Sequence, residues 1–204
     1  MRKKAVLVTL GGVIAVAAIA LGVYSFSDKA ADKAEREAQA AALTNDAIAL
    51  TKDYGTNLQG ALKGAMENSG PVGAVEFCGK EAPGIAQQAS NRSGWRITRT
   101  SLKPRNPKAK PDDFERQVMT DFAASLAGGT PVAALRHAEV VYQNGERVFR
   151  YVQAIPTGEL CLTCHGSDLK PEVDAKIKEL FPDDLATGFK QGELRGAFTL
   201  SKKL

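Results

Sequence analysis

The chain has 204 residues, of which 44% are hydrophobic and 25% are charged, so it fits a globular domain with an appendage and is too apolar for a disordered protein. Three of the 27 basic residues lie within the first four positions, which leaves 24 basic against 23 acidic side chains in the rest. No basic tract with interleaved aromatic residues is present, so the composition argues against a nucleic-acid-binding protein.

The chain begins with a basic tetrapeptide and then an uncharged, apolar run of 20 residues from Ala5 to Tyr24. A helix of that length spans about 30 Å, which matches the core of a bilayer. The positive-inside rule keeps the basic residues in the cytoplasm and predicts export of everything after the run. We therefore predict a single anchor in a bacterial inner membrane, residues 1–26, with the domain facing the periplasm. The alternative is a cleaved signal sequence and a soluble periplasmic protein.

A long amphipathic helix is predicted from residue 27 to about residue 68. Apolar residues recur in its second half at steps of three and four. They are Leu43, Ala47, Leu50, Tyr54, Leu58, Leu62 and Met66. The first half is rich in Ala on every face, so residues 27–42 are predicted to be a helical stalk, through which two copies could form a homodimer. The domain itself is predicted at residues 43–204.

The rest of the chain alternates helix and strand signals. Ser69-Gly70-Pro71 ends the long helix, and Pro71 is well placed to begin the next. Asn144-Gly145 predicts the turn of a β-hairpin. The predicted elements are a helix from 71 to about 89, a strand at 95–102, an irregular loop at 103–111, a helix from Pro111 to Gly128, strands at 137–142 and 147–155, a helix at 171–181 and a strand at 194–200. This order predicts an α+β domain with a small antiparallel sheet covered on one side.

The motif CLTCHG, residues 161–166, carries the chemistry of the chain. Two thiols separated by two residues can bond to the two vinyl groups of one haem, and the adjacent imidazole can then reach the iron. We therefore predict one covalent haem c per chain, attached through Cys161 and Cys164, with His165 on the iron. Attachment of haem c requires export, which agrees with the N-terminal segment.

Two alternatives use the same residues. A disulfide or redox pair of the thioredoxin type should lie between a strand and a helix, whereas Pro156-Thr157-Gly158 before the motif and Gly166 after it favour a loop. A zinc site could take Cys78, Cys161, Cys164 and one histidine, but the second Cys-x-x-Cys pair that structural zinc sites usually have is missing. Both alternatives are weaker than the haem prediction.

The residues themselves leave the sixth ligand of the iron open. Cys78, His137, Met66 and Met119 are the candidates. Both methionines lie among apolar helix residues and are expected in the core, and His137 begins a strand and is expected at the surface. A lone cysteine is most often a small buried hydrophobe.

Several segments taken together resemble the exported monohaem c-type proteins with a PAS-like fold, formerly a family of unknown function. They are GPVGAVEFCGKEAPGIAQQ at 70–88, RTSLKPRNPKAKP at 99–111 with Glu115 after it, CLTCHG, and GELRGAFTL at 192–200. The resemblance covers about residues 40–202. It implies a PAS-like antiparallel sheet with flanking helices and an iron held by His165 and by Cys78. The chain departs from the pattern at Ala109, where an Asn is expected, which puts in doubt whatever that Asn orders.

Basic and aromatic residues near these motifs are candidates for contacts with the porphyrin. Arg99 and Arg105, grouped with Lys103, suit pairing with the haem propionates, and the alternative is a solvated basic loop. The aromatic residues Trp95, Phe149 and Tyr151 lie in predicted strands and are expected to be core before they are haem contacts.

These features predict a haem-binding protein that acts as a periplasmic redox or gas sensor or as a low-potential electron-transfer protein. A thiolate on the iron donates electron density and favours the oxidised state, hence the low potential. A sensor of this size needs a separate signalling or electron-transfer protein as its partner. The alternative function is a haem enzyme such as a peroxidase with an open sixth site. Such an enzyme needs a distal acid or base. The spare histidine is His137, and nothing near it in the sequence resembles a catalytic constellation, so we expect no enzyme.

Overall fold

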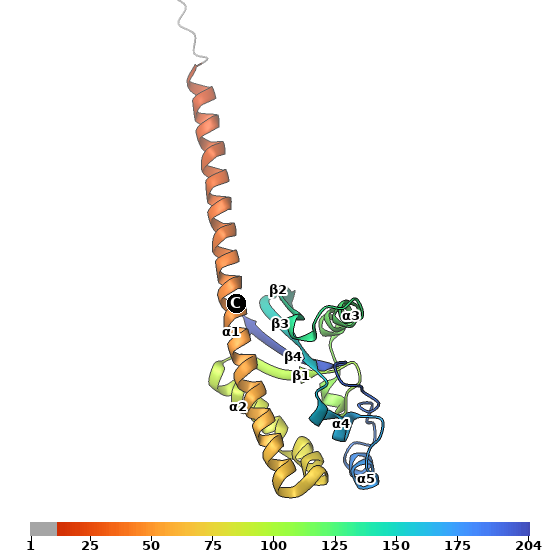
Figure 1. Cartoon of the computed structure of the whole chain (residues 1–204). Coiled ribbons are helices and arrows are strands. Elements are labelled where there is room, and N and C mark those ends of the chain that lie inside the picture. The colour runs from red at the N-terminus through yellow and green to blue at the C-terminus, as the bar shows by residue number, and fades with distance from the viewer. Residues whose placement is uncertain (1–11) are drawn as a thin grey trace, which may run out of the picture. The chain divides into compact units, whose positions relative to one another are not determined.

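The computed structural model describes the backbone of residues 12–204 and the side chains from residue 29 onwards. Its helices are α1 (Gly12–Lys80), α2 (Ala82–Ser93), α3 (Asp113–Ala127), α4 (Glu159–His165) and α5 (Pro171–Leu180), and its strands are β1 (Arg96–Thr100), β2 (Arg136–Gln143), β3 (Glu146–Pro156) and β4 (Leu194–Lys203) (Figure 1). Residues 1–11 of the predicted anchor lie outside this description. Among the described residues, no helix is long and apolar enough to cross a membrane.

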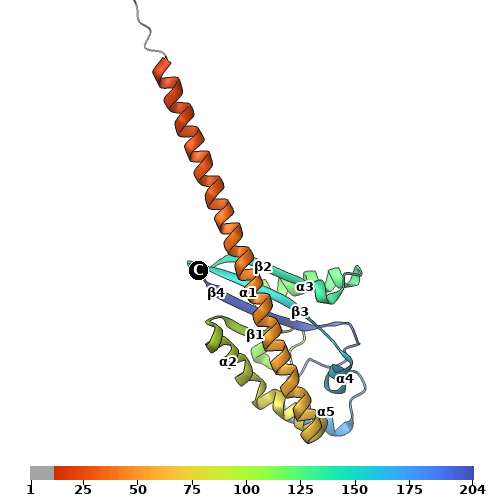
Figure 2. The same ribbon diagram turned by 60° about the vertical axis from the view of Figure 1, so that its left-hand side comes forward.

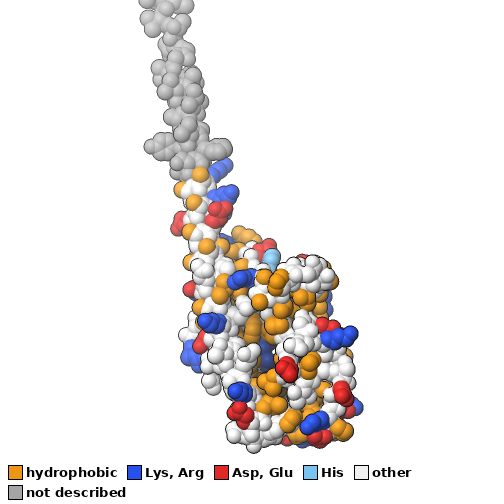
Figure 3. Space-filling view, viewed as in Figure 1, with side chains coloured by type: hydrophobic (Ala, Val, Ile, Leu, Met, Phe, Trp, Pro, Cys, Tyr) orange, Lys and Arg blue, Asp and Glu red, His pale blue; other side chains and the backbone are white. Residues whose placement is uncertain are grey.

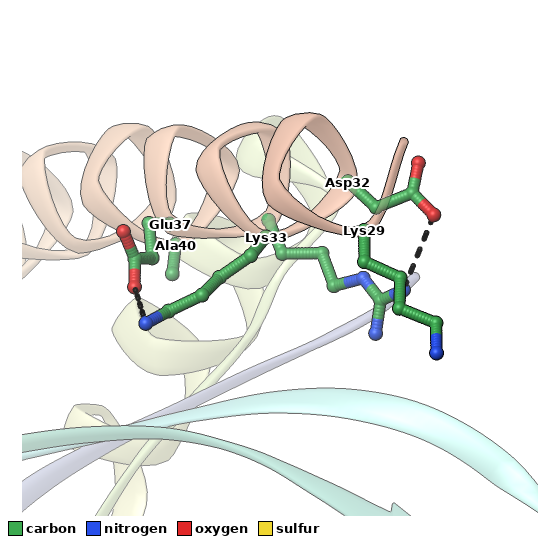
Figure 4. A pocket seen from close by; sticks show the side chains of 6 residues that line it. Lys29, Asp32, Lys33, Glu37 and Ala40 are labelled. Atoms are coloured by element: carbon green, nitrogen blue, oxygen red, sulfur yellow. Dashed lines mark ion pairs between the residues drawn. The ribbon is translucent and has the colours of Figure 1, made fainter. Parts of the chain in front are cut away.

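The chain divides into two compact units, Met1–Ala42 and Leu43–Leu204. The described side chains of the first unit all come from α1, and nearly all are exposed. A shallow pocket on this helix is lined by Lys29, Asp32, Lys33, Arg36, Glu37 and Ala40 (Figure 4). Two ion pairs at four-residue spacing cross it, Lys33 to Glu37 at 3.7 Å and Arg36 to Asp32 at 4.0 Å. Exposed pairs of this kind stabilise a helix by a few tenths of a kcal/mol, so this pocket is a solvated helix face.

Helix α1 changes direction within the second unit at the predicted stop signal. Gly70 leaves the helical region with φ 64° and ψ −171°, a conformation that glycine adopts without steric cost, and Pro71 follows it. The segment after Gly70 carries Cys78 and runs to Lys80. The break predicted from Ser69-Gly70-Pro71 is confirmed, and it lets the Cys78 segment leave the direction of the long helix.

The sheet is antiparallel throughout and has the strand order β1-β4-β3-β2. Strands β2 and β3 form the predicted hairpin, whose turn residues Asn144 and Gly145 have φ of 53° and 80°. The last strand, β4, lies between β1 and β3. Strands β1 and β3 therefore finish, and β4 begins, at one end of the sheet, and α4 leaves from that end directly after Pro156.

Helices cover both faces of the sheet, so the predicted one-sided cover is wrong (Figure 2). On β3, Phe149 and Tyr151 pack with α1 and α2, while Val152 and Ala154 pack with α3. Strand β3 also carries Arg150, which is buried and paired with carboxylates near the start of α3. A buried charge requires such partners.

Several side chains occupy the places that the sequence predicts. Trp95, Phe149 and Tyr151 belong to the core between the sheet and α1, and Met119 of α3 is fully buried. His137 is exposed on β2 and contacts Glu139 at 3.2 Å. The core residues are therefore part of the fold, and the candidate site lies elsewhere.

Candidate haem site

The motif CLTCH is helical, which corrects the prediction of a loop. It forms α4, which begins after Gly158 and ends at Gly166, whose backbone N–H donates to the carbonyl of Leu162 at 2.9 Å. The flanking glycines that suggested a loop are the two caps of this short helix. Because residues three and four apart share a helix face, Cys161, Cys164 and His165 are presented on the same side of α4.

Cys78 lies close enough to this helix to interact with it electrostatically. Its thiol pKa is raised by burial, an effect that Arg99, Arg105 and Arg195 oppose. The pKa of the Cys164 thiol is also raised by burial, with a further increase from the charges of Cys78 and Cys161. All three cysteines are free thiols and half-buried. The fold thus brings the early cysteine to the motif, although most of the sheet separates them in sequence.

The histidine of the motif is held in one tautomer. A carbonyl oxygen can only accept, so Nδ1 of His165 donates its proton to the carbonyl of Ala186 at 2.6 Å, and Nε2 keeps a free lone pair. Burial lowers the pKa of His165 to about 2, with help from the positive charges of Arg195 and Arg105 and against the hydrogen bond to Ala186. His165 is therefore a neutral imidazole whose Nε2 is available to a metal.

Arg105, a predicted propionate partner, is committed to the protein itself. It is buried, and its Nε and Nη2 donate to the two oxygens of Asp184 at 3.1 and 3.2 Å. The same Nη2 donates to the carbonyl of Cys164 at 2.5 Å and to that of Ala186 at 3.3 Å. Arg105 therefore ties the end of α4 to the loop whose carbonyl orients His165.

Arg195 is a site residue that the sequence analysis did not identify. Its Nη2 lies 3.4 Å from Nε2 of His165, and its Nη1 donates to the hydroxyl of Ser101 at 3.2 Å. Burial, together with the positive charges of Arg105 and Arg99, lowers the pKa of Arg195 to about 10. The residue lies within GELRGAFTL, and this position in a quoted motif is the signal that could have drawn attention to it.

Arg99, the other predicted propionate partner, is exposed near the end of β1. Its charge acts on Cys78, His165 and Arg195 alike, so it belongs to the same cluster. Lys103 lies over the ring of Phe189 at 5.2 Å from its centroid, and the guanidinium of Arg195 lies over the same ring at 5.1 Å. The predicted basic loop therefore lies beside the motif.

The loop at Ala109, where the family pattern has Asn, is held in place by hydrogen bonds. The carbonyl of Ala109 accepts from the backbone N–H of Ser101 and from the hydroxyl of Thr100, both at 3.1 Å. The side chain of Asn106 accepts from the backbone N–H of Lys108 at 2.9 Å and so fixes the short turn Pro107–Ala109. Backbone contacts at Ala109 and the side chain of Asn106 hold this loop against the sheet.

An apolar cluster adjoins the motif. Val75 of α1 and Val173, Ile177 and Phe181 of the α5 region are buried together, and Cys164 packs against them. In the space-filling view, apolar side chains gather over the middle of one face of the unit Leu43–Leu204 (Figure 3). A porphyrin needs such apolar surface beside its ligands.

The donor set fits a haem c. Two thiols and an imidazole lie on one face of α4, and the thiol of Cys78 lies nearby. The charged groups around them are three arginines and one carboxylate, that of Asp184. Among the described residues, no group of three or more His, Cys, Asp or Glu side chains is arranged to hold a metal ion by itself.

Comparisons with known proteins agree with the resemblance seen in the sequence. The model of the Tll0287-like family matches residues 27–202. Among solved structures, the crystal structure of the cyanobacterial heme-protein Tll0287 is 25% identical over 60% of this chain and 69% of that chain, with a TM-score of 0.49. No curated protein matches the chain significantly.

Proposed function

The chain belongs to the Tll0287-like family, and on this premise we propose that it binds one haem covalently through Cys161 and Cys164. The protein Tll0287, after which the family is named, is described as a heme-protein. The observation that carries the proposal is that Cys78 and His165 interact with the same three arginines, Arg99, Arg105 and Arg195. The sulfur of Cys78, from a distant part of the chain, therefore shares its charged surroundings with the imidazole of His165 on the Cys-x-x-Cys-His helix.

The side chains have separable tasks in this proposal. His165 supplies Nε2, because its Nδ1 proton is engaged with Ala186. Cys78 supplies a thiolate, which the neighbouring guanidinium groups favour against the cost of burial. When bound, haem supplies an iron that gains or loses one electron. A thiolate from Cys78 would favour the oxidised state and hence a low reduction potential.

The proposed role is a redox or gas sensor or a low-potential electron-transfer protein outside the cytoplasm. Support for export comes from the haem-attachment motif and from the apolar N-terminal run. The mass of the purified protein tests the N-terminal segment, since loss of roughly the first 25 residues means a cleaved signal. The proposed partner is a separate electron-transfer or signalling protein.

We favour this role over a peroxidase because of where His137 lies. This histidine, the other one in the chain, is exposed on β2 and packs against Phe114 of α3 with ring centroids 5.8 Å apart. It therefore does not face His165 as a distal acid or base would.

Covalent attachment is tested with the full chain, expressed with the haem-attachment machinery and denatured before electrophoresis. Haem should remain on the polypeptide, should be lost from the Cys161→Ala/Cys164→Ala variant, and should stay in Cys78→Ala. Absence of haem from the unsubstituted chain would refute the proposed function.

The ligand assignment is tested by electron paramagnetic resonance of the ferric protein. We expect a low-spin, thiolate-type spectrum that Cys78→Ala abolishes and that the matched variant Met66→Leu leaves unchanged. An unchanged spectrum in Cys78→Ala would exclude Cys78 as a ligand, and a high-spin spectrum of the unsubstituted protein would favour an open iron site.

A further inference from the structure

The basic cluster around His165 carries more positive than negative charge. The charges of Arg105 and Arg99 lower the pKa of Arg195, and the charges of all three arginines lower the pKa of His165. Asp184 is the carboxylate that raises the pKa of Arg195. Both oxygens of Asp184 already accept from Arg105. Within the described part of the chain, Arg195 is therefore left without a carboxylate of its own.

The present contacts of Arg195 are weak for a half-buried guanidinium. Its Nη1 donates to a hydroxyl, and its Nη2 faces the neutral Nε2 of His165 at 3.4 Å. The ring of Phe189 supports the guanidinium from one side, at 5.1 Å. If Nε2 gives its lone pair to an iron, Nη2 loses this acceptor. A charged donor that is half removed from water and has no acceptor is costly, so Arg195 then requires a new acceptor.

We infer that Arg195 is a carboxylate-binding residue of the haem site and pairs with a haem propionate, the role that the sequence analysis predicted for Arg99 and Arg105. This inference rests on the proposed function. A guanidinium binds a carboxylate with two parallel hydrogen bonds, which a hydroxyl or an imidazole cannot offer. Arg99 and Lys103 add positive charge on the exposed side of the same cluster.

The test isolates the charge on the propionate. The full chain with Cys161→Ala/Cys164→Ala is loaded with haem or with haem dimethyl ester, which lacks both carboxylates, and transfer to excess apomyoglobin gives the dissociation rate. Arg195→Gln should speed dissociation of haem by about tenfold or more, the size expected for a lost charged hydrogen bond. It should leave dissociation of the ester unchanged, Arg195→Lys should be intermediate, and Arg92→Gln, which removes an arginine that is 61% exposed, should change neither rate.

Two results overturn the inference. One is an Arg195→Gln variant that keeps the dissociation rate of haem. The other is an equal effect on haem and on its ester, since Arg195 would then act through His165 or bind a free anion. If the unsubstituted chain contains no haem, the proposed function fails and this inference fails with it, whereas failure of the inference alone leaves the haem content intact.

A second measurement uses the covalent holoprotein and does not need the cysteine variant. Carbodiimide couples glycinamide to free carboxylates, and mass spectrometry of the haem peptide that contains residues 161–166 reports coupling at the propionates. The rate should rise severalfold in Arg195→Gln and stay unchanged in Arg92→Gln. Equal rates in all three proteins would overturn the inference.

Discussion

Two clusters of charge in the described part of this protein differ in how their charges are balanced. Beside α3, Arg150 donates to Asp112 at 2.8 Å and to Glu115 at 3.0 Å, and Thr199 donates to the same Glu115 at 2.8 Å. Beside α4, arginines gather around His165 and Cys78, and Asp184 is already paired with Arg105. The first cluster has the carboxylates that it needs, and the second has an excess of positive charge.

This difference separates a structural network from a binding site. A buried charge that is paired with carboxylates of the protein holds the fold together, because removing one partner leaves the other uncompensated. A buried excess of one sign costs folding free energy and is expected where a ligand of the opposite sign binds. The comparison predicts opposite effects on stability for substitution of Arg150, which is paired with carboxylates, and of Arg195, which has no carboxylate of its own.

The largest effect is expected for Arg150→Met. The side chain of Arg150 is 5% exposed and that of Glu115 is 8% exposed, so the substitution leaves a buried carboxylate without its cation. We expect the free energy of unfolding to fall by roughly 3–5 kcal/mol in urea denaturation of the haem-free chain. Adding Glu115→Leu should restore part of the loss, and Arg92→Met is the exposed control. A loss below about 1 kcal/mol would contradict a structural role.

A smaller loss is expected for Arg105→Met. The substitution removes the cation that pairs with Asp184. Arg195 also interacts electrostatically with Asp184, so it compensates part of the lost attraction. We expect the free energy of unfolding to fall by about 2 kcal/mol, the cost of an unsatisfied buried polar group. A double-mutant cycle with Asp184→Asn should give a coupling above about 0.5 kcal/mol. Additive effects of the two substitutions would mean that the pair does not connect α4 to its loop.

The haem-free chain should lose stability as the pH falls below about 6.5, the ordinary pKa of histidine. The folded pKa of His165 is lowered to about 2, so between these values the unfolded chain binds a proton that the folded chain does not. The free energy of unfolding then decreases toward acid, by about 2 kcal/mol between pH 6.5 and pH 5. Urea denaturation at both pH values tests this, and His165→Gln should remove this contribution. An equal pH dependence in that variant would show that His165 is not the cause.

The smallest effect, with the opposite sign, is expected for Arg195→Gln in the haem-free chain. Removing this guanidinium relieves its repulsion with Arg105 and Arg99. The free energy of unfolding should stay constant or rise by up to about 1 kcal/mol, as measured by the same denaturation. A loss of more than about 1 kcal/mol would place Arg195 with Arg150 among structural residues and remove the contrast between the clusters.

Local sequence patterns predicted the elements whose signals lie within a few residues. The stripe that begins at Leu43 is buried at Ala47, Tyr54 and Leu58, and the break at Gly70 is present. The Asn144-Gly145 turn joins β2 to β3. These features depend on backbone preference and on helix or strand periodicity, which a short stretch of sequence contains.

The residues of the motif are neighbours in the sequence, whereas the residues that surround them in the fold are not. Cys161, Cys164 and His165 were recognised because five consecutive residues define the motif, and the family resemblance pointed to Cys78. The helical form of α4 was missed because its capping glycines also suit a loop. The second covered face of the sheet was missed because only the tertiary structure decides that α3 packs on Val152 and Ala154.

The sequence by itself predicted a haem cofactor, which membership of the Tll0287-like family supports, and it determined the break at Gly70 and the hairpin, since each of these signals depends on neighbouring residues. Only the tertiary structure decided which arginine is free for a ligand. Arg105 meets Asp184 across 79 residues, and Arg195 meets His165 across 30. Electrostatic pairing depends on distance in space, so the available guanidinium is identified only once the fold has brought these residues together.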